Sequence, residues 1–212
     1  MHTLLDKGYP ALAGLGEGEF AKLLAPLRDV AVERAGETGK AAGARGAAGP
    51  EPGRAPFLLV VTRALVPVEG MVGLTRLERG TKPGIIDRHY EPGAIERFVP
   101  IEGAEPPDER VYLVFDADRG EEFCGAVPDD AMATLAARGR TLLTMEEGLA
   151  FVTQQPAALA KNRCFSLGAS RSGDRRVPAV WISQRAPKLG WCWAGNPHTW
   201  LGVASASERV AA

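Results

Sequence analysis

The sequence predicts an α+β fold: a single domain with a mostly antiparallel C-terminal sheet, central helices, and an N-terminal helical arm on a flexible linker. Three observations lead to this prediction. Helix-like segments occupy the middle of the chain, strand-like segments follow one another toward the C-terminus, and a stretch without large apolar residues precedes both. We therefore divide the chain into an arm (1–35), a linker (36–55) and a body (56–212).

The arm contains one segment with the periodicity of an amphipathic helix, residues 17–35. Pro26 is expected to kink or break this helix, because proline has no backbone N–H to donate. The arm is too short to fold alone, so we expect its apolar face to pack on the body; the alternative is that it docks on another chain or on a second copy. Apolar residues recur there at intervals of three and four: Phe20, Leu23, Leu24, Leu27, Val30 and Ala31.

The linker, residues 36–55, contains six glycines, six alanines and two prolines, and it lacks Val, Ile, Leu, Met and aromatic residues. Such a segment buries too little apolar area to offset the entropy of ordering its backbone. We therefore expect it to be flexible and to carry no function of its own.

The first half of the body alternates strand-like and helix-like segments. Residues 56–63 and 110–120 are apolar and rich in β-branched residues, which predicts buried strands. Residues 127–139 begin with a proline and two acids and end on a glycine, which predicts a short helix. A second helix is predicted over 143–156, because Thr144 and Glu147 have the spacing of a capping box.

The last part of the body is expected to form strands over 162–170, 175–183 and a hairpin over 190–202, GWCWAGNPHTWLG. A two-residue turn at Gly195 and Asn196 would place the side chains of Trp191, Trp193, His198 and Trp200 on one face and Cys192 on the other. Pro197 leaves this turn in question, because it restricts Asn196 to extended conformations. A five-residue loop would instead place Cys192 opposite His198.

Composition excludes several classes of protein. Twenty-five basic and 26 acidic side chains leave no positive field to gather nucleic acid or anionic lipid. No apolar run approaches the roughly 20 residues that a membrane span needs, and the N-terminus lacks the pattern of a signal peptide. Three widely spaced cysteines are typical of reduced thiols rather than of a disulfide framework. We therefore expect a cytoplasmic protein.

Four stretches of the chain resemble an uncharacterised bacterial family that is catalogued only as a domain of unknown function. The resemblance covers most of residues 57–205. It implies a self-contained domain and no particular chemistry. The similar stretches are VTRALVPVEGMV, LTMEEGLAFVTQQP, DRRVPAVWIS and APKLGWCWAGNPHTWLG.

The cysteines and one histidine could form a zinc site or a catalytic pair, but the sequence favours neither. Cys124, Cys164, Cys192 and His198 could supply three thiolates and an imidazole to a zinc ion, but no two of the cysteines have the close spacing usual in structural zinc sites. Cys192 and His198 could also form a nucleophile–base pair for acyl transfer or hydrolysis, provided that they come within hydrogen-bond reach. Buried thiols are the simpler expectation, and the sequence predicts no cofactor.

The aromatic residues of the predicted hairpin suggest a binding surface. Trp191, Trp193 and Trp200 could stack on a ring, and His198 could make a hydrogen bond that depends on pH. Arg175 and Arg176 could pair with a phosphate or carboxylate of the same ligand. The simpler interpretation is that the tryptophans cover the two central helices and belong to the core.

Two polar stretches are expected to be loops without a site. In residues 115–123, FDADRGEEF, the acids precede a glycine, as is ordinary in turns, although such carboxylates could bind a cation. Residues 85–93, IIDRHYEPG, are expected to be a solvated loop. Asp116, Asp118, Glu121 and Glu122 belong to the first stretch, and Asp87, Arg88, His89 and Glu91 to the second.

The function that the sequence favours is a binding module for a small anionic or ring-containing ligand at the C-terminal Trp/His/Arg surface. Two alternatives remain open. One is an enzyme that uses Cys192 and His198, and the other is a protein-interaction module, or a homo-oligomer, that uses the arm. No membrane contact and no strong nucleic-acid contact are expected.

Overall fold

The computed structural model describes residues 1–42 and 51–212, and the fold is α+β as predicted. The described helices are α1 (His2–Asp6), α2 (Tyr9–Leu12), α3 (Glu17–Ala42), α4 (Val68–Leu74), α5 (Pro128–Ala137) and α6 (Met145–Gln154), with 3-10 turns η1 (Ile95–Arg97), η2 (Glu121–Phe123) and η3 (Pro156–Ala158). The described strands are β1 (Arg54–Val61), β2 (Ile85–Ile86), β3 (Val99–Pro100), β4 (Val111–Asp118), β5 (Thr141–Leu142), β6 (Cys164–Ser166), β7 (Ser170–Arg171), β8 (Arg176–Ser183), β9 (Ala186–Trp193), β10 (Leu201–Val203), β11 (Ser205–Ala206) and β12 (Glu208–Val210).

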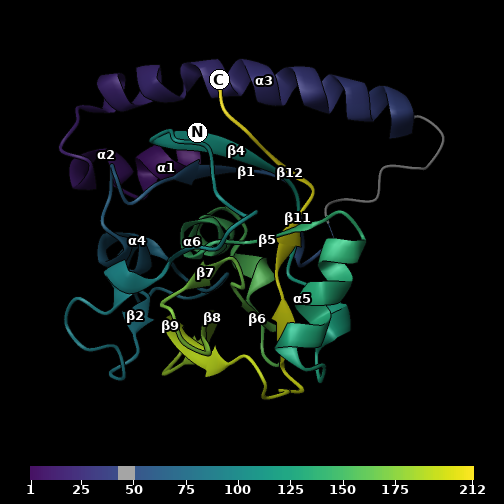
Figure 1. Ribbon diagram of the computed structural model, residues 1–212. Helices are drawn as coiled ribbons and strands as arrows, with labels where there is room; N and C mark the ends of the chain where they lie inside the picture. Colours follow the sequence, from purple (N-terminus) through teal and green to yellow (C-terminus); the bar gives the residue numbers. More distant parts are fainter. Residues whose placement is uncertain (43–50) are drawn as a thin grey trace.

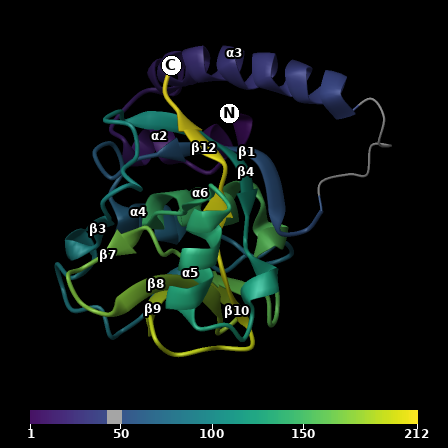
Figure 2. The ribbon, with the colours of Figure 1, turned by 45° about the vertical axis from the view of Figure 1, so that its right-hand side comes forward.

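Two main sheets enclose helix α6 (Figure 1). The first sheet has the order β1-β4-β11-β5, with β12 also paired to β4, and the second has the order β10-β6-β8-β9-β2. Pairing is mostly antiparallel, except that β10 and β2 join the second sheet in parallel at its two edges. Helix α3 crosses the outer side of the first sheet, so the second sheet lies at the opposite end of the molecule (Figures 1 and 2).

Helix α6 is buried on all sides because a sheet packs on each of its faces. Its predicted capping box is confirmed: the Glu147 backbone N–H donates to the Thr144 hydroxyl (3.3 Å), and the Thr144 N–H donates to the Glu147 carboxylate (2.7 Å). Toward the second sheet, the ring of Phe151 lies 5.6 Å from that of Phe165 on β6.

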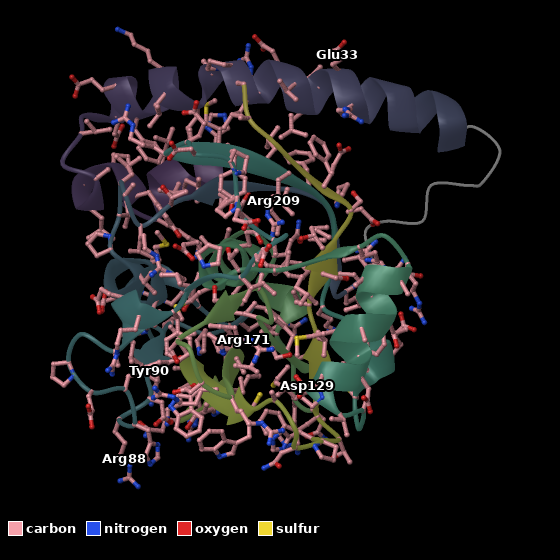
Figure 3. The ribbon with its side chains drawn as sticks, in the orientation of Figure 1. Glu33, Arg88, Tyr90, Asp129, Arg171 and Arg209 are labelled. Atoms are coloured by element: carbon pink, nitrogen blue, oxygen red, sulfur yellow. The ribbon has the colours of Figure 1, made fainter. Side chains whose placement is uncertain are left out.

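The same Glu147 carboxylate is the centre of a buried polar network between α6 and the first sheet. It is fully buried and accepts hydrogen bonds from the Tyr112 hydroxyl (2.8 Å) and from Nε (2.5 Å) and Nη2 (2.9 Å) of Arg209. Figure 3 shows Arg209 between the first sheet and α6. Burial raises the pKa of Tyr112, and the charge of Glu147 raises it further. The short strand β12 is therefore fixed by an internal ion pair as well as by its pairing with β4.

The arm forms the predicted helix, and its apolar face packs on this chain's own first sheet. Phe20, Leu24, Leu27 and Ala31 are buried in the main core. These apolar residues of the arm are therefore covered by the chain's own body. The predicted break at Pro26 is wrong, because α3 continues through it; the buried residues on both sides of the proline hold the helix on the sheet despite the missing N–H.

The predicted limits of the linker are also wrong. Helix α3 extends to Ala42, because the alanine, lysine and glutamate that follow residue 35 favour helix. At the other end, Arg54 and Ala55 already belong to β1. The middle of the predicted linker, residues 43–50, lies outside the described residues.

The predicted hairpin over 190–202 is not formed. Strand β9 pairs with β8 on one side and with β2 on the other, whereas β10 pairs with β6. Residues 194–200 therefore form a loop that passes from one part of the second sheet to its far edge. Pro197 favours this outcome, because it has no N–H with which to continue a ladder beside β9.

No helix in the described part of the chain is long and apolar enough to cross a membrane.

Candidate functional site

The outer face of the second sheet, turned away from α6, carries the candidate site. Phe165 points to α6, and its partner across the strands is Val180, so the neighbours of Val180 on β8, Ala179 and Trp181, point outward. Directly opposite Ala179 and Trp181 on β9 are Gly190 and Lys188. The antiparallel register therefore places Trp181, Lys188 and Gly190 on one outer surface.

A cavity of about 720 Å³ opens at this surface. Its polar residues come from the loop after η3 and from the loop after β9, whereas its apolar residues come largely from β6, β8 and β9. All four tryptophans of the chain line it. The lining residues are Lys161, Asn162, Cys164, Ala179, Trp181, Ile182, Trp191, Cys192, Trp193, Asn196, His198, Trp200 and Leu201.

The aromatic residues of the cavity form two contacting groups. In the first, the ring of Trp200 lies 6.3 Å from that of Trp181, nearly perpendicular to it, and 5.4 Å from the ring of His198. In the second, Trp191 and Trp193 are 5.0 Å apart. Trp193 is 46% exposed, a large value for a tryptophan. Trp191, Trp193, His198 and Trp200 thus line one cavity, but no ring contact joins the two groups among the described residues, and Cys192, predicted to point away from them, lines the same cavity.

The position of Trp181 depends on the absence of a side chain at residue 190. A Cβ atom added to Gly190 would lie 2.0 Å from Cη2 of Trp181, so the indole rests directly on the backbone of β9. The carbonyl of Gly190 accepts a hydrogen bond from the hydroxyl of buried Tyr90 (2.9 Å), which fixes that stretch of strand. The position of the Trp181 ring in the cavity lining therefore depends on the sheet and not on the loops.

A buried ion pair lies beside the ring of Trp181. The Lys188 ammonium lies 5.9 Å from the centre of the Trp181 ring, and its Nζ lies 2.7 Å from Oδ2 of Asp87. Nδ1 of His89 lies 2.5 Å from Oδ1 of the same carboxylate. Burial alone would raise the pKa of Asp87, but the hydrogen bonds from Lys188 and His89, together with the Lys188 charge, lower it to about 2. Asp87, expected in a solvated loop, is thus buried and ionised.

The two arginines predicted to bind an anion do not line the cavity. Arg176 pairs with Asp174 (2.8 Å) and lies over the rings of Phe98 and Trp191. Arg175 is exposed and borders a separate, smaller hollow of about 250 Å³. The prediction is corrected because Asp174 and the rings of Phe98 and Trp191 hold Arg176, while Arg175 precedes β8 at the separate hollow. Among the described residues that line the cavity, Lys161 is the one with a permanently basic side chain.

Cys192 and His198 both line the cavity, but no hydrogen bond joins their described side chains. Burial raises the pKa of Cys192 to about 11, and the nearby charge of Arg171 opposes this only in part. Cys192 is therefore a protonated thiol at neutral pH, the less reactive form. The nucleophile–base pair lacks the geometry and the thiolate that it needs.

The zinc hypothesis is not supported by the arrangement of the ligands. The described residues contain no group of three or more His, Cys, Asp or Glu side chains placed to hold a metal ion. Cys124 does not line the cavity that Cys164, Cys192 and His198 share. The three thiols are free, and burial raises the pKa of Cys124 and of Cys164.

The acidic turn after β4 behaves as expected. The Asp118 carboxylate accepts a hydrogen bond from the Gly120 N–H (2.8 Å) and pairs with Arg54 (2.8 Å), while Asp116 pairs with Arg140 (2.6 Å). These carboxylates are satisfied by the protein itself.

Sequence reasoning missed Trp181, Gly190, Lys161 and Asn162. The strand pattern of 175–183 assigns Trp181 to a face of its strand, but no local signal places Trp181 next to Trp200, which reaches it from the loop before β10. Lys161 and Asn162 form a tight turn in which Asn162 has φ +60°, and an Asn in that conformation is a turn signal rather than a binding signal.

Comparison with known proteins gives a family without an assigned function. The model of a family described as "Family of unknown function (DUF5701)" matches residues 3–212. No curated protein and no solved structure matches the chain.

Proposed function

Because the chain belongs to DUF5701, a family of unknown function, we propose a function from the geometry of the site: the protein is a binding module for a small ring-containing ligand. The single observation that carries the proposal is that all four tryptophans and His198 line one open cavity. Aromatic side chains on a protein surface are costly unless they contact something. Stacking on such rings contributes about 1–3 kcal/mol per ligand ring.

The size and composition of the cavity support this proposal. A volume of about 720 Å³ lies within the range of sites for small molecules and cofactors. Its walls are apolar, and its few polar groups, Asn162, Asn196 and His198 among them, lie on the two loops that border the sheet. Such a site holds a flat apolar body and orients it by hydrogen bonds at one end.

A cytoplasmic location is part of the proposal. The three free thiols support a reducing compartment, since disulfides form and persist in oxidising ones.

Tryptophan fluorescence tests the proposal directly, because every tryptophan reports on the cavity. Titration with mononucleotides, nicotinate and substituted benzoates, excited at the red edge of tryptophan absorption, is expected to show saturable quenching by at least one class of ring compound. Free N-acetyltryptophanamide, titrated in parallel, corrects for light absorbed by the ligand.

Two variants complete this test. Trp200→Leu should weaken binding of the quenching compound by about tenfold, measured by calorimetry, because it removes one stacking surface. Phe57→Leu, which changes an exposed ring on β1 of the first sheet, should leave the affinity unchanged. Linear, unsaturable quenching by every compound would contradict the proposal.

A further inference from the structure

We propose that the cavity selects anionic ring ligands and rejects cationic ones; this inference rests on the proposed function and deepens it. An aromatic cavity can bind either cationic or anionic ligands. Tryptophan-lined sites commonly hold quaternary ammonium groups, because the faces of the rings attract cations. The charged groups around the rings therefore decide between the two kinds of ligand.

The lining itself favours an anion. Lys161 stands in the turn before β6 and makes no ion pair with any residue that the structure describes. No Asp or Glu is among the described residues that line the cavity. A site for a cation would be expected to place a carboxylate at its rim, whereas this rim offers an unpaired ammonium group to a carboxylate or phosphate.

A second cation lies near Cys192. Arg171 is close enough to Cys192 for its charge to act on that thiol. Its Nε donates to the Gly168 carbonyl (3.2 Å) and its Nη2 contacts the sulfur of Met132 (3.2 Å), so both partners are uncharged. Figure 3 shows Arg171 beside the second sheet, with Asp129 farther out at the end of α5. Among the described side chains, no carboxylate lies within ion-pair distance of Arg171.

A third positive charge lies beside Trp181, on the same surface of the sheet. The ammonium of Lys188 lies 5.9 Å from the centre of the Trp181 ring, and it pairs with the Asp87 carboxylate at 2.7 Å. Lys188 does not itself line the cavity. A ring beside a cation attracts a second cation less strongly, and it favours an electron-rich or anionic partner.

Three naphthalene compounds of matched shape test the selection: 2-naphthoate, 2-naphthylmethylammonium and the neutral 2-naphthylmethanol. Calorimetry on the full chain at low salt should show the anion binding about tenfold more tightly than the cation, with the alcohol between them. The preference should shrink as salt rises, because rim charges are screened.

The variant Lys161→Gln should weaken binding of the anion by about threefold and leave the affinity for the alcohol unchanged. Lys22→Gln is the matched control, since it makes the same change of net charge on exposed α3, at the opposite end of the molecule. Equal affinities for the three compounds, a preference for the cation, or equal effects of the two variants would overturn the inference and leave the proposed function standing. Failure of all three compounds to bind would count against the proposed function itself.

Discussion

Replacing Arg209 by methionine should lower the free energy of unfolding by about 3–5 kcal/mol, because the substitution leaves the Glu147 carboxylate charged, buried and without its counter-ion. Glu147 is 0% exposed. The guanidinium supplies two hydrogen bonds to this carboxylate, and it donates others to the Thr141 hydroxyl (2.6 Å) and the Leu142 carbonyl (2.8 Å). The variant thus removes the contacts through which Arg209 joins β12 to β5 and to the start of α6.

Urea denaturation of the two single variants Arg209→Met and Arg138→Met measures this effect. Arg138 makes a comparable two-oxygen contact with Glu122, but both side chains are about half exposed, so the control should lose less than about 1 kcal/mol. A further variant that also changes Glu147 to Leu should regain part of the loss, since no unpaired charge then remains. Equal losses for Arg209→Met and Arg138→Met would show that the buried network does not stabilise the fold as described.

The second large effect concerns binding: Gly190→Ala should weaken the affinity for 2-naphthoate by about tenfold. The new methyl group would lie 2.0 Å from Cη2 of Trp181, so the indole must leave its place on the wall of the cavity. Losing one stacking surface costs about 1–3 kcal/mol of binding free energy, which corresponds to roughly tenfold or more. The same crowding should lower the free energy of unfolding by about 1–3 kcal/mol.

A glycine in open surroundings provides the control for this variant. Nothing lies within 4 Å of a Cβ built on Gly73 in α4. Gly73→Ala should therefore keep the wild-type affinity and gain up to about 1 kcal/mol of stability, since alanine favours helix. Wild-type affinity in Gly190→Ala would mean that ligands do not stack on Trp181.

The parts of the fold that local chemistry decides could be predicted from the sequence. The capping box of Thr144 and Glu147 is a contact within one turn of helix, and the helix forms where it was expected. The strands over 54–61 and 111–118 could be predicted because their runs of apolar residues are typical of buried strands. At Pro26, packing on the first sheet outweighed the missing N–H, and after residue 35 a run of helix-favouring residues outweighed the glycines.

The candidate site could be predicted only in part, because it depends on strand order. Gly-Asn between two aromatic segments is a good signal for a hairpin, yet pairing of β10 with β6 sends the chain elsewhere. The loop nevertheless returns His198 and Trp200 to the cavity that Trp191 and Trp193 also line. Trp181, contributed by a different strand, and Lys161, contributed by a different loop, are brought there by long-range pairing that no local pattern encodes.

The most direct test of the central claim follows the four indole N–H signals of the ¹⁵N-labelled protein during addition of 2-naphthoate. All four tryptophans line the cavity, whereas α3 lies at the far end of the molecule. A ligand in the cavity should shift several indole signals along saturable curves with a common affinity and leave the amide signals of α3 in place. Indole signals that stay fixed at millimolar naphthoate, or that shift no more than those of α3, would contradict the claim that this cavity is a binding site for ring compounds.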